Sequence, residues 1–312
     1  MPTFVFIDGA AGTTGLEIRE RLARRAEFTL LVLSDHERKD IAKRKDALHS
    51  ADIAILCLPD DAAREAVTLA NGSNTKIIDA SSAHRTADGW TYGFPELVGA
   101  HKVAEAQFVS NPGCYPSGFL ALVAPLTDAG LLPADWPYTV NAVSGYSGGG
   151  NGMIERFQTE GNIAFRAYGL NLAHKHLPEM QKYAQLTYAP VFSPSVVNAH
   201  RGMMIDVPLN LAAMDDGISA DTLHDRLTAT YSDSPLITVA PLGSHPSELL
   251  LLDGVQSWEG MELIVASSDD GTQMRLIARL DNLAKGASGA AVQNLNLMSG
   301  LPETSGLRLA RD

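Results

Sequence analysis

Cys114 is the residue whose setting most strongly suggests chemistry. It stands in the run SNPGCYPS (residues 110–117), between an expected strand and an expected helix. A thiol at a helix N-terminus has a lowered pKa and a larger thiolate fraction, which suits a nucleophile. The other cysteine, Cys57, lies inside the apolar run AILCLP and fits a buried core residue. We therefore take Cys114 as the candidate nucleophile.

The second group with chemical potential is the segment HKHLPE, which contains His174, His176 and Glu179. A metal site is one interpretation, but the i, i+2 spacing is not the HExxH pattern and no further ligand cluster accompanies it. A thiol nucleophile needs a proton acceptor nearby, so a catalytic base is the better interpretation. On this segment alone, two surface histidines beside a helix explain the pattern more simply. We predict no metal.

A glycine-rich turn, GAAGTTG at residues 9–15, follows an expected strand and opens an expected helix. Its spacing is GxxGxxG and not the commoner GxGxxG. Glycines let the backbone approach a pyrophosphate closely, and a helix N-terminus offers N–H groups and a positive dipole end. The strand–turn–helix context therefore predicts a dinucleotide site.

The choice between NAD and NADP depends on the end of the second expected strand, at Ser34 and Asp35. An acidic residue at this point normally holds a ribose 2′-hydroxyl and favours NAD. Arg38 and Lys39 follow closely and suit a 2′-phosphate. The run HERKD is also typical of a solvated charged surface. The residues alone leave the two cofactors open.

The elements that must position these residues begin with a regular alternation of strands and helices. Apolar strands alternating with amphipathic helices predict a parallel, doubly wound, Rossmann-like α/β sheet. A helix is expected after Cys114, with Pro116 early and Gly130 near its end. The expected strands of the first part lie at residues 4–7, 28–34, 52–59 and 76–81.

Beyond that helix the pattern changes. Residues 138–152 read as a strand that runs into a glycine-rich loop, and residues 201–211 and 260–283 read as antiparallel strands. SDDG (268–271) is typical of a hairpin turn. A last helix is expected from about Ser288. These features predict that the middle region forms a separate α+β domain.

Composition excludes several classes of protein. The 312 residues carry a net charge of −12 and two cysteines, which argues against a nucleic-acid binder and a disulfide framework. The N-terminal segment lacks the features of a signal peptide, and no apolar run approaches the ~18 residues of a membrane span. A cytoplasmic location is the default expectation, without nucleic-acid or membrane partners.

Taken together, these motifs resemble one enzyme family over nearly the whole chain. The sequence is similar to the N-acetyl-γ-glutamyl-phosphate reductases of arginine biosynthesis, mostly to their shorter type, within the aspartate-semialdehyde dehydrogenase-like superfamily. The combination of SNPGCYP, HxHxPE and KGASGxAVQNxN in this order is specific, whereas GAAGTTG alone is not. The matching runs are GAAGTTG (9–15), DASSAHR (79–85), YGFPEL (92–97), SNPGCYPSG (110–118), SGYSGGG (144–150), HKHLPEM (174–180) and DNLAKGASGAAVQNLN (281–296).

The resemblance implies a domain organisation, a cofactor and a reaction. Residues 1–113 and 286–312 are expected to form the NADP-binding domain, and residues 114–285 the catalytic and dimerisation domain. NADPH is expected to reduce the acyl phosphate to the aldehyde through a thioester on Cys114. A homo-oligomer, either a dimer or a tetramer, is expected.

The resemblance also implies roles for individual residues. Cys114 matches the nucleophile and His174 the acid–base residue, and Lys285 to Gly289 match the segment that closes over the nicotinamide. The expected substrate-binding residues are Arg85, Ser144, Ser147, Tyr168, His176 and Glu179. The expected cofactor-binding residues are Gly9, Gly12, Thr13, Thr14, Gly15, Ser34, Arg38, Lys39, Ser81, Gly286, Ala287 and Gly289.

Some of these roles have open alternatives. Arg85 is the candidate for holding the acyl phosphate, although a structural arginine paired with an acid explains it equally well. Ser144 and Ser147 lie in the same loop, and the sequence does not choose between them. The nearest alternative function is a sister reductase acting on aspartyl or aminoadipyl phosphate. A non-enzymatic dinucleotide sensor is the alternative of another class, and the presence of Cys114 argues against it.

Overall fold

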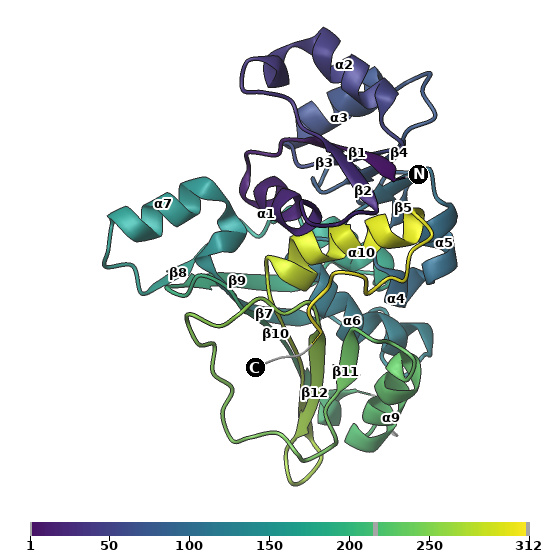
Figure 1. Cartoon of the computed structure of the whole chain (residues 1–312). Helices are drawn as coiled ribbons and strands as arrows, with labels where there is room; N and C mark the ends of the chain where they lie inside the picture. Colours follow the sequence, from purple (N-terminus) through teal and green to yellow (C-terminus); the bar gives the residue numbers. More distant parts are fainter. Residues whose placement is uncertain (1, 215–217, 310–312) are drawn as a thin grey trace. The chain divides into compact units, whose positions relative to one another are not determined.

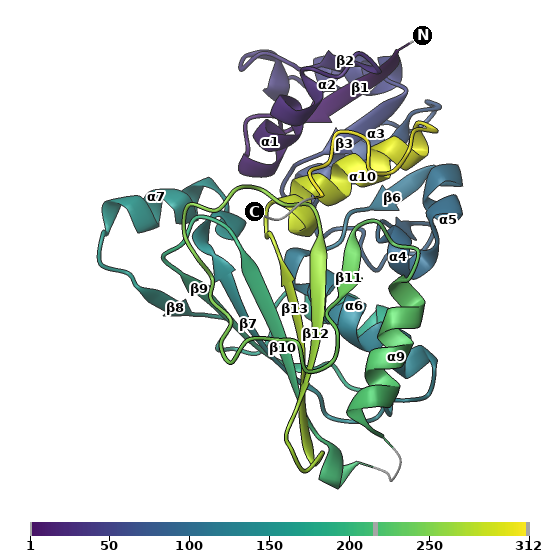
Figure 2. The same cartoon turned by 60° about the horizontal axis from the view of Figure 1, so that its bottom comes forward.

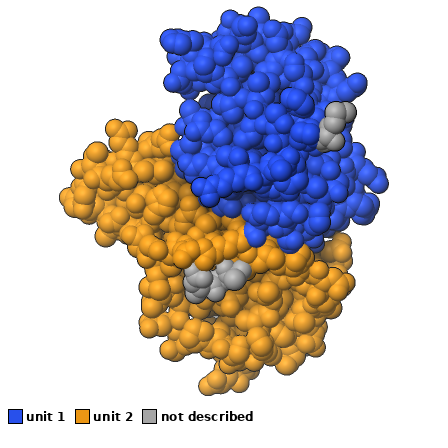
Figure 3. Space-filling view, viewed as in Figure 1, with its two compact units in different colours: residues 1–112, 287–307 blue, residues 113–286, 308–312 orange. Residues whose placement is uncertain are grey.

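The computed structural model describes residues 2–214 and 218–309. Its contacts divide the chain into two compact units, coloured separately in Figure 3. The first unit comprises Met1–Pro112 and Ala287–Leu307, and the second comprises Gly113–Gly286 and Arg308–Asp312. The chain passes from the second unit back to the first within a five-residue π turn, η4 (Ala284–Ser288).

The first unit contains a six-stranded parallel sheet with the strand order β2-β1-β3-β4-β6-β5. The doubly wound sheet predicted from the sequence is confirmed, although β2 ends at Leu31, short of the expected residue 34. Its elements are β1 (Thr3–Asp8), α1 (Thr13–Leu22), β2 (Phe28–Leu31), η1 (Glu37–Lys39), α2 (Ile41–Ser50), β3 (Ile53–Leu56), α3 (Asp60–Leu69), β4 (Lys76–Asp79), β5 (Thr91–Tyr92), α4 (Pro95–Val98), α5 (Ala100–Glu105), β6 (Phe108–Ser110) and α10 (Gly289–Met298).

Helices cover both faces of this sheet, and each face has its own apolar core. One core joins residues of α1, α5 and α10 to strand residues such as Val5 and Ile55. The other joins residues of α2 and α3 to Phe6 and Leu56. Figure 1 shows α2 and α3 on one side of β1 and β3, and α1 and α10 on the other. Burial of both faces explains why the strands read as continuous apolar runs.

Helix α10, the last element of the first unit, is buried despite its polar residues. Asn294 donates hydrogen bonds to the Gly93 carbonyl and to Asn111 Oδ1, both at 3.0 Å. Gln293 and Asn296, also fully buried, donate to neighbouring segments of the same unit. Buried amides need such partners, so the run AVQNLN fixes the segments that follow β5 and β6.

The second unit contains a seven-stranded mixed sheet with the order β11-β12-β13-β10-β7-β9-β8. The antiparallel hairpin of β12 and β13 is confirmed, whereas the parallel pairs β7–β9 and β11–β12 were not anticipated. Its elements are α6 (Cys114–Asp128), β7 (Thr139–Gly145), η2 (Tyr146–Gly149), α7 (Asn151–Thr159), β8 (Phe165–Ala167), α8 (Leu177–Tyr183), β9 (Val191–Val197), β10 (Met203–Asn210), η3 (Leu211–Ala213), α9 (Ala220–Tyr231), β11 (Ile237–Val239), β12 (Met261–Ser267) and β13 (Gln273–Leu280).

Helices α6 and α9 pack together on one face of this sheet, as Figure 2 shows. The Tyr231 hydroxyl of α9 donates a hydrogen bond of 2.8 Å to the Ala121 carbonyl of α6. Most of α6 is buried, from Tyr115 to Leu126. The helix that starts at Cys114 is therefore held along its length, which gives its first residue a fixed position.

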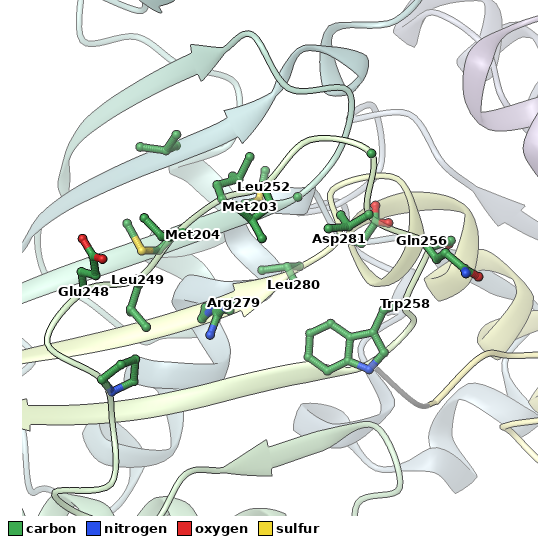
Figure 4. Close-up of a pocket in the computed structure, with 18 of the residues that line it drawn as sticks. Met203, Met204, Glu248, Leu249, Leu252, Gln256, Trp258, Arg279, Leu280 and Asp281 are labelled. Atoms are coloured by element: carbon green, nitrogen blue, oxygen red, sulfur yellow. The ribbon is translucent and has the colours of Figure 1, made fainter. Parts of the chain in front are cut away.

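A long segment without helix or strand, residues 240–260, encloses a pocket with strands β10 and β13 (Figure 4). The pocket has a volume of about 770 Å³. Met203, Leu280 and Trp258 give it apolar walls, and Asp281 and Arg279 add charged groups to its lining. None of the residues expected to be catalytic or to bind a ligand lines this pocket.

The C-terminal residues differ from the expected organisation, because Arg308 and Leu309 group with the second unit and not with the first. Glu259 and Arg308 exchange main-chain and side-chain hydrogen bonds. The Trp258 indole N–H donates to the Leu309 carbonyl at 2.8 Å. The other two boundaries lie within one residue of the positions expected from the sequence.

Candidate active site

Cys114 is the first residue of α6, and Gly113 is its N-cap. The Gly113 carbonyl accepts hydrogen bonds from the Ser117 N–H and hydroxyl, both at 2.9 Å, and these close the first turn. Cys57 instead packs against the core of the first unit, where burial raises the pKa of its thiol to about 12. Of the two thiols, only Cys114 has the helix N-terminal position that favours a thiolate.

Glu179 fixes the residue that precedes the thiol. Its carboxylate is almost fully buried on α8, and Oε2 accepts a 3.1 Å hydrogen bond from the Gly113 N–H. The sequence placed Glu179 in the substrate pocket and gave no sign of this contact. The structure shows that Glu179 holds the N-terminus of α6.

The two histidines lie in an aromatic cluster on the same unit. The rings of His174 and His176 are 4.7 Å apart between centroids, and His174 packs edge-on against Tyr168 at 5.6 Å and Phe192 at 5.1 Å. Tyr115, the residue after the nucleophile, is 6.1 Å from His174. The structure therefore brings His174, His176 and Tyr168 together around the first turn of α6.

A main-chain hydrogen bond selects the tautomer of the neutral His174 ring. The His176 N–H donates to His174 Nδ1 at 3.2 Å. A nitrogen that accepts a hydrogen bond carries no proton, so the neutral ring holds its proton on Nε2. Neutral His174 therefore presents Nε2–H as a hydrogen-bond donor.

Tyr115 and Tyr168 form a hydroxyl chain near the thiol. The Tyr168 hydroxyl donates to that of Tyr115 at 3.2 Å, and the Tyr115 hydroxyl donates to the Ser195 carbonyl at 3.2 Å. Burial raises the pKa of Tyr168 to about 12 and also raises that of Tyr115, and the charge of Cys114 adds to both effects. Both phenols stay protonated. The sequence analysis missed Tyr115, although its place directly after Cys114 was a usable signal.

The two loop serines have different surroundings. Ser147 donates a short hydrogen bond to the His200 carbonyl and accepts one of 3.0 Å from the Asn282 amide. Ser144, at the end of β7, donates to the next carbonyl of the chain and also interacts with Tyr115. Ser147 thus holds the loop together, whereas Ser144 faces the tyrosine beside the nucleophile.

Gly286, in the π turn η4, lies against the nucleophile. A Cβ added there would be 2.8 Å from Cys114 Cβ and 3.3 Å from Cys114 Cα. The Gly286 N–H donates to the Asp281 carbonyl at 2.9 Å. Further along the turn, in the first unit, the Ala287 carbonyl accepts from Asn111 Nδ2 at 3.0 Å. Lys285 is buried beside Gly286, and Gly289 begins α10.

The glycine turn of the first unit forms a backbone cradle at the end of β1. Gly9 has φ +90°, and a Cβ there would collide with the Cys57 carbonyl, while a Cβ on Gly15 would collide with the Gly9 carbonyl. Gly12 is the N-cap of α1, which starts with Thr13 and Thr14 and has no side-chain cap. A cap without a side chain leaves room for the phosphates of a dinucleotide. The residues fit such a cofactor.

The segment after β2 places a carboxylate and two cationic side chains close together. Arg38 pairs with Asp35 at 3.0 Å, and Lys39 is exposed beside it. The Ser34 hydroxyl donates to Glu37 at 2.7 Å, which lowers the pKa of Glu37. Asp35 is therefore already paired with a cation. This pairing makes its carboxylate less available to accept a hydrogen bond from a free ribose 2′-hydroxyl, the contact that would favour NAD.

Ser81 and Arg85 are built into the loop after β4. The Ser81 hydroxyl donates to Asp79 at 2.8 Å and accepts from the Ala83 N–H at 3.1 Å. Arg85 is nearly buried, and its Nε donates to the Asn111 carbonyl at 3.0 Å. These contacts give both residues a structural task, and their ligand-binding roles stay predictions.

Residues 2–214 and 218–309 contain no group of three or more histidine, cysteine or acidic residues arranged to hold a metal ion. No helix in these ranges combines the length and hydropathy needed to cross a membrane.

Comparison with protein families assigns a role to each unit. Residues 5–106 match the model described as semialdehyde dehydrogenase, NAD binding domain, and residues 114–282 match semialdehyde dehydrogenase, dimerisation domain. The first unit is thus a nicotinamide-dinucleotide-binding domain, and the second is an oligomerisation domain that also carries the candidate nucleophile.

Curated relatives narrow this class. N-acetyl-gamma-glutamyl-phosphate reductase 2 of Nostoc sp. is 48% identical over 97% of this chain and 98% of its own length. N-acetyl-gamma-glutamyl-phosphate reductase of Brucella ovis is 48% identical over 95% of this chain and 98% of its own. The chain belongs to the N-acetyl-gamma-glutamyl-phosphate reductase family, as the sequence motifs indicated.

Solved structures with lower identity confirm the fold alone. Aspartate semialdehyde dehydrogenase from Francisella tularensis has a TM-score of 0.71 at 13% identity, covering 95% of this chain and 99% of that one. The Candida albicans enzyme, solved with NADP, has a TM-score of 0.63 at 13% identity, covering 96% and 98%.

Proposed function

We propose that this chain uses NADPH to reduce N-acetyl-γ-glutamyl phosphate to N-acetylglutamate semialdehyde and phosphate. The observation that carries the proposal is Cys114 at the start of α6, with His174 and the two tyrosines packed around its turn. A nucleophilic thiol beside an acid–base residue is the arrangement needed for covalent acyl transfer. The family to which the chain belongs supports the substrate.

The cofactor is proposed to be NADP and not NAD. The glycine cradle supplies the pyrophosphate site, and a bound reduced cofactor supplies hydride. Arg38 and Lys39 offer two cations where the 2′-phosphate of a Rossmann-type cofactor lies. Pairing of Asp35 with Arg38 supports this choice, because the carboxylate beside the phosphate is neutralised.

The residues of the second unit account for the covalent steps. The Cys114 thiolate attacks the acyl carbon, the bond from that carbon to the phosphate oxygen breaks, and a thioester results. Hydride reduction of the thioester gives a thiohemiacetal, which expels the thiolate and releases the aldehyde. One proton is consumed overall, by the departing phosphate. His174 is proposed as the acid–base residue, and its Nε2–H donates to the developing oxyanion, a contact typically worth ~3 kcal/mol.

The remaining residues are proposed to bind or to position. Tyr168, His176 and Ser144 line the substrate side of the thiol, and Arg85 holds the leaving phosphate. Glu179 positions Gly113. Ser147 acts on the substrate only through its loop. The functional protein is proposed to be a homodimer or a homotetramer.

The test is a single-turnover assay without reductant. Given the acyl phosphate and NADP⁺, which shapes the site without donating hydride, the enzyme should release about one phosphate per active site and acquire the acyl mass on Cys114. NADPH should then discharge it as aldehyde. Cys114→Ser should give no burst, and Cys57→Ser should behave as the unmodified enzyme. Turnover without any burst or adduct would sink the covalent mechanism.

A further inference from the structure

Arg166 is a cation close to the candidate site that no role described so far uses. It lies in β8, the edge strand of the second sheet, next to β9 (Figures 1 and 2). Its guanidinium carbon is 4.6 Å from the centre of the Tyr168 ring, over the face of that ring. Within residues 2–214 and 218–309, no carboxylate forms a salt bridge with Arg166. Its positive charge is therefore not neutralised by the protein described.

The contacts of Tyr168 connect Arg166 to the nucleophile. The Tyr168 hydroxyl reaches Tyr115, the residue after Cys114, and the Tyr168 ring packs against His174. Cys114 and Arg166 both act electrostatically on the same phenol, one raising and the other lowering its pKa. One tyrosine ring thus separates an unneutralised guanidinium from the surroundings of the thiol.

The strand register fixes this arrangement independently. The Tyr115 hydroxyl is bonded to the Ser195 carbonyl of β9, and Ser195 pairs with Ala167 in β8. Arg166 precedes Ala167 and pairs with Val196. The first turn of α6 is therefore attached to the strand pair that carries Arg166.

Other cations of the second unit are less suited to bind an anion here. Arg201 is engaged by Asp281 at 2.8 Å, and Arg156 by Glu160 at 3.0 Å. Lys175 is exposed to solvent, where an ammonium stays strongly hydrated and discriminates poorly between anions. Arg166 combines partial burial with a free charge and a planar guanidinium, which can bind a carboxylate through two parallel hydrogen bonds.

The proposed substrate carries a second anion besides its phosphate. Its α-carboxylate lies four bonds from the acyl carbon, about 5 Å in an extended chain with C–C bonds of about 1.5 Å. We propose that Arg166 binds this α-carboxylate and so selects the amino-acid end of the substrate, away from the leaving phosphate. The proposal rests on the proposed function and adds a specificity-determining residue to it.

The experiment compares two aldehydes in the reverse reaction, with phosphate and NADP⁺. N-acetylglutamate semialdehyde has the carboxylate, and 4-acetamidobutanal is the same molecule without it. For Arg166→Gln, kcat/KM for the first should fall roughly 10- to 100-fold, the loss of one charged hydrogen-bonding partner. For the same variant, kcat/KM for 4-acetamidobutanal should stay within about threefold of its value in the unmodified enzyme. Arg166→Lys should lose less than Arg166→Gln.

A binding measurement separates recognition from catalysis. Protection of Cys114 from iodoacetamide gives apparent dissociation constants for N-acetylglutamate and for 4-acetamidobutyrate. Arg166→Gln should weaken only the first. Arg156→Gln, which removes an arginine already paired on the surface of the same unit, should change neither.

Each other outcome has a definite meaning. Equal losses with both aldehydes and both acids would show a structural role for Arg166 and overturn the proposal. A rise confined to the KM of phosphate would assign Arg166 to the leaving group and overturn it as well. If the unmodified enzyme does not oxidise N-acetylglutamate semialdehyde, the proposed function itself fails, which is a separate result.

Discussion

Replacing Gly286 with alanine should misplace the nucleophile without changing the chemical identity of any reacting group. The added Cβ would be 2.8 Å from Cys114 Cβ and 3.2 Å from the Asp281 carbonyl oxygen. Gly286 does not have a positive φ, so alanine meets no conformational penalty there. The effect must therefore come from steric contact, chiefly with Cys114, whose Cβ is fixed to the start of a buried helix and cannot rotate away.

The size of the effect follows from the required displacement. Ordinary contacts of a Cβ begin near 3.4 Å, so the turn and the nucleophile must separate by at least about 0.6 Å. Misplacement of a reacting group by ~1 Å costs up to ~10²-fold in rate. We expect Gly286→Ala to lower kcat by about 10- to 100-fold. Overpacking at such a buried contact typically destabilises by ~1–3 kcal/mol.

The assay measures kcat, the phosphate burst and the melting temperature, with Gly152→Ala as the matched control. Gly152 is in α7 of the same unit, and nothing lies within 4 Å of its added Cβ. Alanine there should leave the rate unchanged and raise helix stability by ~0.5–1 kcal/mol. If Gly286→Ala retains kcat within about threefold while remaining folded, the proximity of η4 to the thiol does not control its position and the reasoning is refuted.

Three further results are expected. Removing Arg38 and Lys39 together should raise the KM of NADPH and spare activity with NADH; equal losses with both cofactors would contradict a 2′-phosphate site. His174→Ala should lower kcat by ~10²–10⁴-fold, the usual contribution of an acid–base group, and His176→Ala should be milder, with the reverse order exchanging their roles. Hydrogen bonds within a hairpin turn, chiefly from a serine hydroxyl, lower the pKa of Asp270 from 3.8 to about 2. Its ionised form therefore stabilises the fold above about pH 4, and that contribution is lost as pH falls from 3.8 toward 2. Asp270→Asn should show a smaller fall in melting temperature over that range than the unmodified protein, and an identical fall would contradict this.

Features set by neighbouring residues could be predicted from the sequence. The turn before Cys114 contains proline and glycine and lies between an apolar strand and an apolar helix, all within residues 108–128. The glycine turn at residues 9–15 could be predicted for the same reason, because it also lies between an apolar strand and a helix that are adjacent in the sequence. Strand periodicity also identified the hairpin of β12 and β13. In each case the signal is local, because periodicity and turn chemistry depend on adjacent residues.

Features that depend on distant partners could not be predicted. Ser144 and Ser147 are equivalent in sequence, and only their contacts with Tyr115 and with His200 distinguish them. The sequence marks Ser81 as an expected cofactor residue but gives no sign that its hydroxyl is buried against Asp79. Whether such a side chain binds a ligand or holds a loop depends on which hydrogen-bond partners the fold brings close to it. Those partners are distant in the sequence, so a single sequence does not identify them.

Glu179 shows how such a distant contact changes the chemical argument. From the sequence alone, the N-terminus of α6 appeared to act on the Cys114 thiol without competition. The structure places a buried carboxylate on the Gly113 N–H at that same N-terminus. A carboxylate there offsets part of the positive end of the helix dipole. It also fixes the peptide that leads into Cys114, which a flexible glycine would otherwise leave poorly defined. Glu179 thus fixes the position of the peptide before the thiol, while it reduces the electrostatic activation that the helix N-terminus gives to that thiol.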